Sequence, residues 1–249
     1  MHPESLLALF AETAGEVAAA LRPLTADDRR ARTDRPGQYH LDTVADAAAL
    51  SVLGRASVRV LSEESGWTGP EASPVIVVID PVDGSTNASR GIPYWATSLC
   101  AVDGDGPLAA LVVNQATGVT TTAVRGHGAW RDGRPVRPAK VERLEDAVVA
   151  LSGRPAHWLA WRQFRALGSA ALSLCDLAAG VIEGVVDAGP HHAPWDYLGG
   201  LLACTEAGAA VAEAGGKPLY DLGFDVRRQL VAAANPVLLE QLLPAVTPA

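Results

Sequence analysis

The segment Asp80-Pro-Val-Asp-Gly-Ser-Thr-Asn87 places two carboxylates three residues apart, directly before a glycine turn. It follows the apolar run Val75–Ile79, which is short and mostly β-branched and therefore predicts a buried strand. Uncompensated carboxylates at the edge of a core are unfavourable, and a divalent cation is the simplest compensation. Gly84 allows backbone amides to approach an anion closely. The segment thus indicates a site for a metal ion and a phosphate group.

Further acids stand at the ends of other predicted elements. Glu63 follows a short strand predicted at 58–61, and Asp196 opens a helix predicted to run to about residue 208. Each acid alone could be a helix cap or a surface residue, but together with the carbonyl of Val82 they form a set of oxygen ligands. Such a set, without clustered cysteine or histidine, favours Mg²⁺ or Mn²⁺ over Zn²⁺. Two such ions about 4 Å apart can activate water and stabilise the leaving oxygen in phosphoryl transfer.

Composition limits the classes of partner. The chain has 249 residues, of which 49% are hydrophobic and 19% charged, as in a folded globular protein. Its net charge of −8 and the absence of a Lys/Arg block argue against nucleic acid as a partner. No apolar stretch is long enough for a membrane span, and the first residues lack the cationic region of a signal peptide, so we expect a cytoplasmic location. Cys100, Cys175 and Cys204 are expected to be core thiols.

Hydrophobic periodicity predicts alternating helices and strands. Helices are expected near 6–21, 43–53, 168–179, 196–208 and 236–243, and strands near 58–61, 75–80, 96–103, 107–114, 118–131 (a pair), 148–151, 181–186, 211–212 and 230–234. The polar segment 22–40 is predicted to be a loop. Thr43 and Asp46 lie three residues apart and therefore share a face of the second helix. Trp158 and Trp161 are expected to cover the core.

These motifs resemble those of the inositol monophosphatase family, within the fructose-1,6-bisphosphatase-like superfamily of Li⁺-sensitive, Mg²⁺-dependent phosphatases. The octapeptide at 80–87 is the most specific match. Glu63-Glu64 before it, and Trp195-Asp196 with Glu206-Ala-Gly after it, match two further family motifs in the same order. The segments Gly126-His-Gly-Ala-Trp130 and Val231-Ala-Ala-Ala-Asn235 also resemble family segments. The resemblance covers roughly residues 5–243.

The resemblance implies a layered α/β fold, a five-layer αβαβα sandwich. It implies a single unit over residues 1–249, with a metal-site half at 1–145 and a C-terminal half at 146–249. It also implies a homodimer that binds two or three Mg²⁺ per subunit, with Mn²⁺ possible. The implied reaction is hydrolysis of a small-molecule phosphate monoester by metal-activated water.

The resemblance also assigns roles to individual residues. Glu63, Asp80, the Val82 carbonyl, Asp83 and Asp196 would hold the metals, with Asp80 shared between two ions. Glu63 would also serve catalysis through a third ion, and Asp46 with Ser85 would orient or deprotonate the water, supported by Thr43. The residues implied to bind the phosphate and the substrate hydroxyls are Asp83, Gly84, Ser85, Gly168, Ser169, Ala170, Asp187 and Asp196.

The chain departs from the family pattern in two places. Near the metal site, His40 replaces an acid of the family before the Thr43/Asp46 pair, with Asp42 displaced. Near the substrate, the segment before Gly168 is short, and the loop 187–194 is about two residues longer. His191 and His192 are interpreted as surface or substrate-rim residues because no third soft ligand accompanies them. An inositol monophosphate-like or related polyol or sugar phosphate is the expected substrate. Histidinol phosphate and 3′-phosphoadenosine 5′-phosphate are alternatives, and a non-catalytic phosphate-binding scaffold is the competing class.

Overall fold

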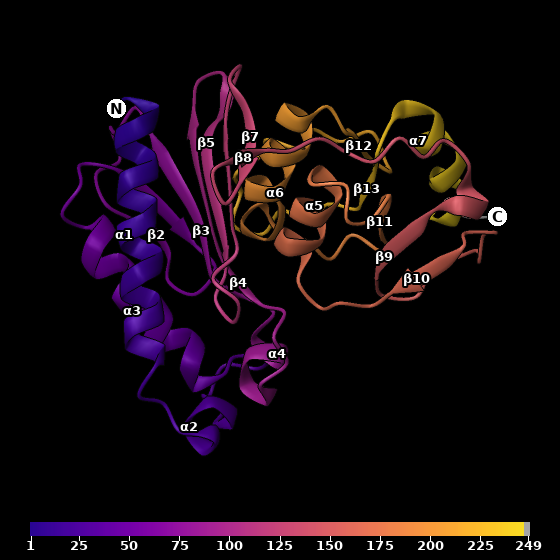
Figure 1. The fold of residues 1–249 in the computed structure, drawn as a ribbon. Helices are drawn as coiled ribbons and strands as arrows, with labels where there is room; N and C mark the ends of the chain where they lie inside the picture. The colour runs from indigo at the N-terminus through magenta and orange to yellow at the C-terminus, as the bar shows by residue number, and fades with distance from the viewer. Residues whose placement is uncertain (247–249) are drawn as a thin grey trace.

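Two β-sheets alternate with three layers of helices (Figure 1). The computed structural model describes residues 1–246. The helices are α1 (Pro3–Leu21), α2 (Ala26–Arg30), α3 (His40–Leu53), α4 (Ser85–Arg90), α5 (Ala170–Ala178), α6 (Pro194–Ala207) and α7 (Pro236–Leu242), with 3-10 turns η1 (Leu144–Asp146) and η2 (Leu243–Ala245). The layered α/β arrangement expected from the sequence is therefore confirmed.

The first sheet has eight strands in the order β2-β1-β3-β4-β5-β6-β7-β8. They are β1 (Arg59–Ser62), β2 (Gly66–Thr68), β3 (Ile76–Asp83), β4 (Ala96–Asp103), β5 (Gly106–Asn114), β6 (Thr120–Val124), β7 (Gly128–Arg131) and β8 (Arg134–Pro135). Strand β1 runs parallel to β3, and the other pairs are antiparallel. Because β1 and β3 are parallel, their carboxyl ends lie at the same edge of the sheet.

Helices α1 and α3 cover one face of this sheet, and α6 lies against the other. Along β3, Val77 and Ile79 join the core formed with α1 and α3, whereas Val78 joins the core on the opposite face. Alternate residues of a strand point to opposite faces, so a strand covered on both sides needs an unbroken apolar run. This explains why the segment before Asp80 is uniformly apolar.

The second sheet has five strands in the order β10-β9-β11-β13-β12. They are β9 (Val148–Ser152), β10 (Gln163–Arg165), β11 (Gly184–Asp187), β12 (Ala210–Glu213) and β13 (Leu230–Ala233). Helices α5 and α6 lie between the two sheets, and α7 covers the outer face of the second sheet. One continuous core therefore joins the two sheets through α5 and α6.

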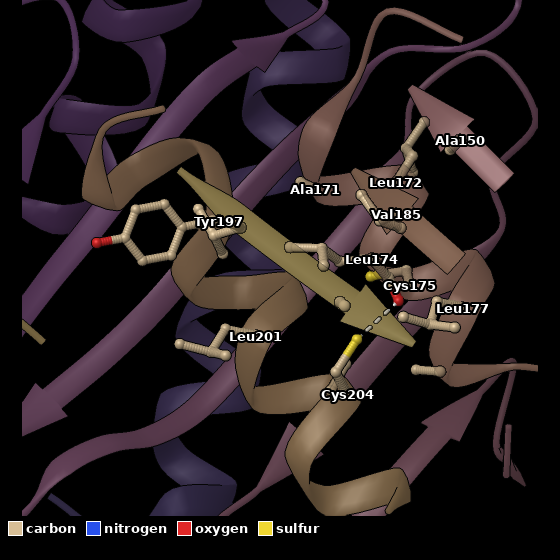
Figure 2. Packing of buried hydrophobic residues seen from close by; sticks show 14 of the residues in the cluster. Ala150, Ala171, Leu172, Leu174, Cys175, Leu177, Val185, Tyr197, Leu201 and Cys204 are labelled. Carbon is tan, nitrogen blue, oxygen red and sulfur yellow. Dashed lines mark hydrogen bonds between the residues drawn. The ribbon is translucent and has the colours of Figure 1, made fainter. Parts of the chain in front are cut away.

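Close contact between α5 and α6 depends on small residues. A Cβ atom on Gly200 would lie 2.5 Å from the Leu174 Cβ, and one on Gly199 would lie 2.8 Å from the Ser98 Oγ in the first sheet. Figure 2 shows Leu174 of α5 facing α6, with the Cys204 thiol donating to the Leu174 carbonyl (3.1 Å). All three cysteines are buried and free, which confirms that they are core thiols.

Most predicted elements are present, with differences in two segments. The segment 22–40 contains helix α2, because Thr25 and Asp28 cap each other's backbone amides. Trp158 does not cover the core, since 55% of its surface is exposed. It packs edge-on against Trp161 and Phe164 beside the edge strand β10, and only Trp161 reaches the core. Within the described residues, no helix is both long and apolar enough to cross a membrane.

The α5–α6 contact leads to a stability prediction. Gly200→Ala should lower the free energy of unfolding by about 1–3 kcal/mol, because the added methyl group overlaps Leu174 in a packed interface. Gly15→Ala in α1 is the matched control, since its Cβ would meet nothing within 4 Å. It should gain up to about 1 kcal/mol from helix propensity. Urea unfolding measures both, and equal stability of the Gly200 variant and wild type would contradict the packing.

Candidate metal and phosphate site

Three acidic side chains from three elements meet at the carboxyl edge of the first sheet. Glu63 follows β1, Asp80 lies near the end of β3, and Asp196 lies in the first turn of α6. One carboxylate oxygen of each lies within 4.8 Å of the others. Asp80 is 2% exposed, and the Asp196 carboxylate also accepts from the Ala193 amide (2.6 Å). These three sequence-predicted ligands therefore form one cluster.

The chain bends sharply after Asp80. The pairing of β3 with β4 shifts register between Asp80 and Asp83, and the Asp80 Oδ1 accepts from the Val82 amide (2.9 Å). The Ser85 hydroxyl donates to the Val82 carbonyl (2.9 Å). Gly84 has φ +96°, and a Cβ atom there would lie 2.8 Å from the Gly168 carbonyl oxygen. Only glycine fits this position, because both the backbone angle and the space exclude a side chain.

Asp83 lies outside the three-acid cluster and faces helix α5. Its Oδ2 accepts from the Ser169 hydroxyl (2.5 Å) and the Ala171 amide (2.7 Å), and its Oδ1 accepts from the Ala170 amide (3.3 Å). Burial raises the pKa of Asp83, while these hydrogen bonds act in the opposite direction. The structure thus brings the predicted substrate residues Gly168, Ser169 and Ala170 directly against the end of the octapeptide.

The charges of the three-acid cluster fit a cation. Burial raises the pKa of Glu63 and Asp80 well above the usual range, and repulsion between the neighbouring carboxylates raises both further. Burial also raises the pKa of Asp196 to about 7, although His192 opposes this shift. A buried group of like charges is stable only when it is neutralised or paired. A divalent ion held by oxygen ligands satisfies this requirement, so the residues fit the metal predicted for them.

Asp46 and Thr43, which are expected to handle water, form hydrogen bonds with other groups than each other. The Asp46 carboxylate accepts from the Ser62 hydroxyl (2.5 Å), and the Thr43 hydroxyl donates to the His40 carbonyl (2.7 Å). Within residues 1–246, no hydrogen bond joins Asp46 to Thr43 or Ser85. Asp42 is the carboxylate whose charged form the nearby Ser85 hydroxyl favours, which acts to lower the pKa of Asp42.

Asp42 is a buried acid that the sequence placed only as a displaced family position. It is 3% exposed, its Oδ2 accepts from the Tyr39 amide (2.8 Å), and its Oδ1 has no hydrogen-bond partner. Burial raises its pKa to about 6, although the Tyr39 amide and the Ser85 hydroxyl favour the charged form. The unpartnered Oδ1 of Asp42 lies buried beside Ser85, so Asp42 is a further carboxylate at the edge of the proposed site.

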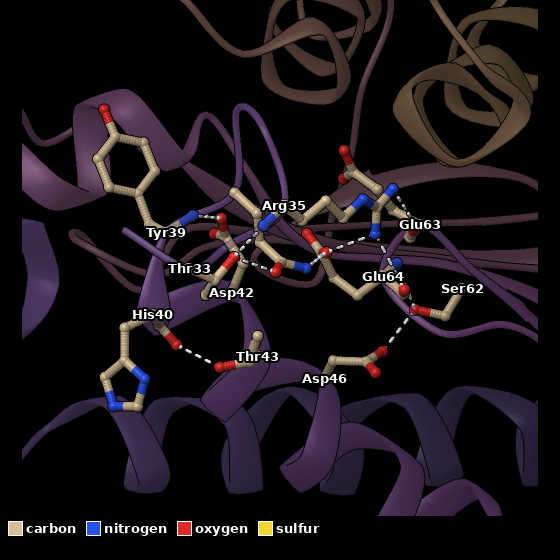
Figure 3. Close-up of polar contacts among 11 residues, drawn as sticks. Thr33, Arg35, Tyr39, His40, Asp42, Thr43, Asp46, Ser62, Glu63 and Glu64 are labelled. Carbon is tan, nitrogen blue, oxygen red and sulfur yellow. Dashed lines mark hydrogen bonds and ion pairs between the residues drawn. The ribbon is translucent and has the colours of Figure 1, made fainter. Parts of the chain in front are cut away.

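The polar segment before α3 lies against Glu63 and Glu64 (Figure 3). The Arg35 guanidinium donates to the Glu64 carboxylate (3.2 Å) and to the backbone carbonyls of Glu64 (3.0 Å) and Glu63 (3.4 Å). The Gln38 amide donates to the same Glu64 carboxylate. A cavity lies between this segment and Glu63 of the acidic cluster. Its wall includes Arg35, Gln38, Asp42, Glu63 and Ser85.

A second cavity, of about 300 Å³, lies beside Asp83, which forms part of its wall. Its wall includes Gly168, Ser169 and Asp187, all predicted substrate residues. Asp187 is 1% exposed, and its Oδ2 lies 2.9 Å from the His192 Nδ1. The His192 ring also lines the cavity, whereas His191 is exposed and is not among the lining residues. The structure thus separates two adjacent histidines that the sequence treated alike.

Some motif residues serve the scaffold. The Asn87 side chain donates to the carbonyls of Tyr94 (2.7 Å) and Leu167 (2.8 Å), which ties the octapeptide to the segment before α5. The Glu206 carboxylate accepts from the amides of Gly126 (2.8 Å) and Gly128 (2.9 Å). Two motifs that are far apart in sequence therefore contact each other away from the metal cluster. The sequence alone does not distinguish this structural role of Asn87 and Glu206 from a role in the chemistry.

Comparison with known proteins identifies the family of this chain. The model of the inositol monophosphatase family matches residues 8–248. The chain belongs to the inositol monophosphatase family. It is 33% identical over 98% of both chains to the fructose-1,6-bisphosphatase/inositol-1-monophosphatase of Archaeoglobus fulgidus. It is also 34% identical to the inositol-1-monophosphatase of Mesorhizobium japonicum, over 85% of this chain and 84% of that one.

Solved structures place the chain in the inositol monophosphatase fold. A protein from Pyrococcus horikoshii, described as having similarities for inositol-1 monophosphatase, superposes with a TM-score of 0.89. That alignment covers 99% of this chain and 100% of the other at 24% identity, so it bears on the fold alone. The family model and the sequence identities confirm the resemblance to the inositol monophosphatase family that was inferred from the octapeptide.

The buried acids give a prediction for stability against pH. The pKa of Asp196 is about 7 in the folded protein and about 4 when unfolded, so between these values the folded state binds more protons. Without metal, stability should be fully present near pH 4 and fall as the pH rises through 7. Mg²⁺ should offset this loss, and its stabilisation should grow with pH because protons compete for the ligands.

Thermal unfolding with EDTA or Mg²⁺ at pH 5.5 and pH 8 measures both effects. The rise in Tm on adding Mg²⁺ should be larger at pH 8. Asp80→Asn should raise the Tm in EDTA at pH 8 and shrink the rise caused by Mg²⁺. An equal Mg²⁺ effect at the two pH values would contradict the assignment of the cluster as a cation site.

Proposed function

We propose that this protein is a metal-dependent phosphatase that hydrolyses a small phosphate monoester and releases inorganic phosphate. The observation that carries the proposal is the cluster of Glu63, Asp80 and Asp196, with Asp83 and the turn at Gly84 beside it. Family membership supports the same reaction class, because relatives of this chain are named as phosphatases.

The acidic residues would hold two or three Mg²⁺, with Mn²⁺ as a substitute. Glu63, Asp80, Asp196 and the Val82 carbonyl supply oxygen ligands on one side, and Asp83 supplies a carboxylate on the other. When bound, such ions lower the pKa of a coordinated water and neutralise charge on the transferring phosphoryl group. The protein's own part is to hold five oxygen donors on rigid elements, so that they need not reorganise during the reaction.

Ser85 and the nearby acids would position the attacking water. The Ser85 hydroxyl is held by the Val82 carbonyl, which leaves its oxygen free to accept a hydrogen bond. Asp46, fixed by Ser62, is the base that the family resemblance implies, and Thr43 is its expected support. Asp42 lies close to Ser85 in the wall of the same cavity and is a second carboxylate able to accept a proton there.

The turn after Asp83 would bind the phosphate. Gly84 has φ +96°, and the amides of Gly84 and Ser85 lie at the start of helix α4. Exposed consecutive amides of this kind bind anions. The alcohol portion of the ester would then extend toward Gly168, Ser169, Ala170 and Asp187, in the cavity of about 300 Å³.

The expected substrate is an inositol monophosphate-like or related polyol or sugar phosphate. Histidinol phosphate and 3′-phosphoadenosine 5′-phosphate are the alternatives to test beside it, and a non-catalytic scaffold predicts no turnover on any ester. The homodimer and the cytoplasmic location implied by the resemblance also stay predictions.

Removal of the central carboxylate tests the metal assignment. Asp80→Asn should lower kcat about a thousandfold or more, because it removes a ligand charge in the middle of the cluster. The variant should fold, since the change reduces repulsion between buried acids. Phosphate release with Mg²⁺ from a panel of monoesters measures the effect. Asp105→Asn, at an exposed turn, is the matched control and should retain full activity. Near-normal turnover of the Asp80 variant would refute the assignment.

Removal of the Ser85 hydroxyl tests the positioning of water. Ser85→Ala should lower kcat about ten- to a hundredfold with little change in KM, because the hydroxyl acts on the water and not on the bound ester. Ser89→Ala removes a hydroxyl of the same helix that donates to the Thr86 carbonyl, and it should leave both constants unchanged. Steady-state kinetics compare the two, and an effect of Ser85→Ala confined to KM would exclude the role in catalysis.

A further inference from the structure

Asp187, His192 and Ser152 lie next to one another in the wall of the 300 Å³ cavity, where a carboxylate–imidazole contact and a hydrogen bond link them. The Asp187 Oδ2 lies 2.9 Å from the His192 Nδ1, and the His192 Nε2 lies 3.2 Å from the Ser152 Oγ. Ser152 ends β9, and Asp187 ends the neighbouring parallel strand β11, where the two are paired in register. All three residues line the cavity that also contains Asp83. These three residues therefore lie beside the proposed metal centre, and none of them is a proposed metal ligand.

The arrangement withdraws Asp187 from direct contact with a ligand. One of its carboxylate oxygens faces His192, and the other accepts from the Gly189 amide (3.4 Å). The residue is 1% exposed, whereas the His192 side chain keeps 17% of its surface accessible. The imidazole therefore occupies the position between Asp187 and a bound substrate.

His192 is held firmly in this orientation. Its amide donates to the Arg228 carbonyl (3.3 Å), and its carbonyl accepts from the Arg228 amide (2.8 Å). Arg228 is itself buried and donates to the Pro218 carbonyl (2.7 Å) and the Asp221 carboxylate (3.0 Å). Because Nδ1 faces a carboxylate, Nδ1 carries a proton and Nε2 is the atom that remains for recognition.

The rest of the cavity wall limits what Nε2 can recognise. No lysine or arginine is among the lining residues of the described chain, and Ala150, Leu151, Val185 and Leu230 make much of the wall aliphatic. A second phosphate would find no cationic partner except the imidazole. A hydroxyl group suits the pair of Nε2 and Ser152 Oγ in either protonation state of His192, because a hydroxyl both donates and accepts.

We propose that His192, oriented by Asp187 and paired with Ser152, reads a hydroxyl group on the carbon skeleton of the phosphate ester. This inference rests on the proposed phosphatase function and makes His192 a specificity-determining residue in the place expected for Asp187. It identifies the substrate class as a hydroxylated monophosphate. A cavity of about 300 Å³ is at the lower end of the range for small-molecule sites, in keeping with a compact alcohol.

Two esters that differ only in hydroxyl groups provide the test. Myo-inositol 1-phosphate and cyclohexyl phosphate share a six-carbon ring and a phosphate, and kcat/KM with Mg²⁺ is measured for both. Wild type should prefer the hydroxylated ester by roughly ten- to a hundredfold, because a polar site rejects an analogue that leaves its groups unpaired.

His192→Ala should lower kcat/KM for the inositol ester roughly ten- to a hundredfold and change the cyclohexyl ester by less than about threefold. Ser152→Ala should act in the same direction with a smaller loss, and it keeps the test valid if His192→Ala fails to fold. His192→Gln, which keeps a hydrogen-bonding group near the position of Nε2, should restore part of the preference. The exposed neighbour provides the matched control, His191→Ala, which should leave both esters unchanged.

The outcomes separate this inference from the proposed function. Equal losses on both esters in the His192 and Ser152 variants, or no loss on either, would overturn the recognition role while phosphatase activity stands. Equal use of the two esters by wild type would do the same. A wild-type enzyme that hydrolyses no ester of the panel would overturn the proposed function and this inference with it.

Discussion

The structure is governed by the cost of burying the carboxylates of Glu63, Asp80 and Asp196 together. Two charged carboxylate oxygens within 4.8 Å of each other repel by on the order of 3 kcal/mol or more at the effective dielectric of a protein site. Such a cluster persists only if stable elements hold its members in place. The parallel pair β1 and β3 fixes two of them, and α6, packed between the sheets, fixes the third. The fold therefore holds three like charges close together, although they come from three separate elements.

The second half of the octapeptide joins the layers of the molecule. Asp83 accepts hydrogen bonds from the start of α5, Gly84 lets the Gly168 carbonyl approach, and Asn87 binds the Leu167 carbonyl. These contacts connect the edge of the first sheet to the helices that carry the second sheet. A change in the packing of α5 would thus alter the distance between the metal ligands and the cavity for the alcohol. Motif residues of this kind serve positioning as much as chemistry.

Much of this architecture could be predicted from local patterns. The apolar run before Asp80 identified a strand covered on both faces, and the acids at strand ends identified the edge where the site lies. Contacts between distant segments could not be predicted in this way. Nothing local to Asp187 shows that an imidazole covers it, nothing local to Asp46 shows that Ser62 is its partner, and the exposure of Trp158 depends on where the edge strand β10 ends the sheet. Helix α2 is a different case: its capping signal in Thr25 and Asp28 is local, yet the polar composition of residues 22–40 predicted a loop.

The separation of the metal cluster from the alcohol cavity has a consequence for specificity. The acids lie on β1, β3 and α6, whereas Ser152 and Asp187 lie at the ends of β9 and β11, and His192 lies on the loop that follows β11. That loop is anchored to Arg228 through backbone pairing at His192, and its last residue, Ala193, donates to the Asp196 carboxylate. The residues of the loop before His192 can therefore change while both of these contacts stay in place. Loops on a rigid scaffold are where recognition varies most freely. Two departures of this chain from the family pattern, the short segment before Gly168 and the longer loop 187–194, fall at the cavity proposed for the ester's alcohol.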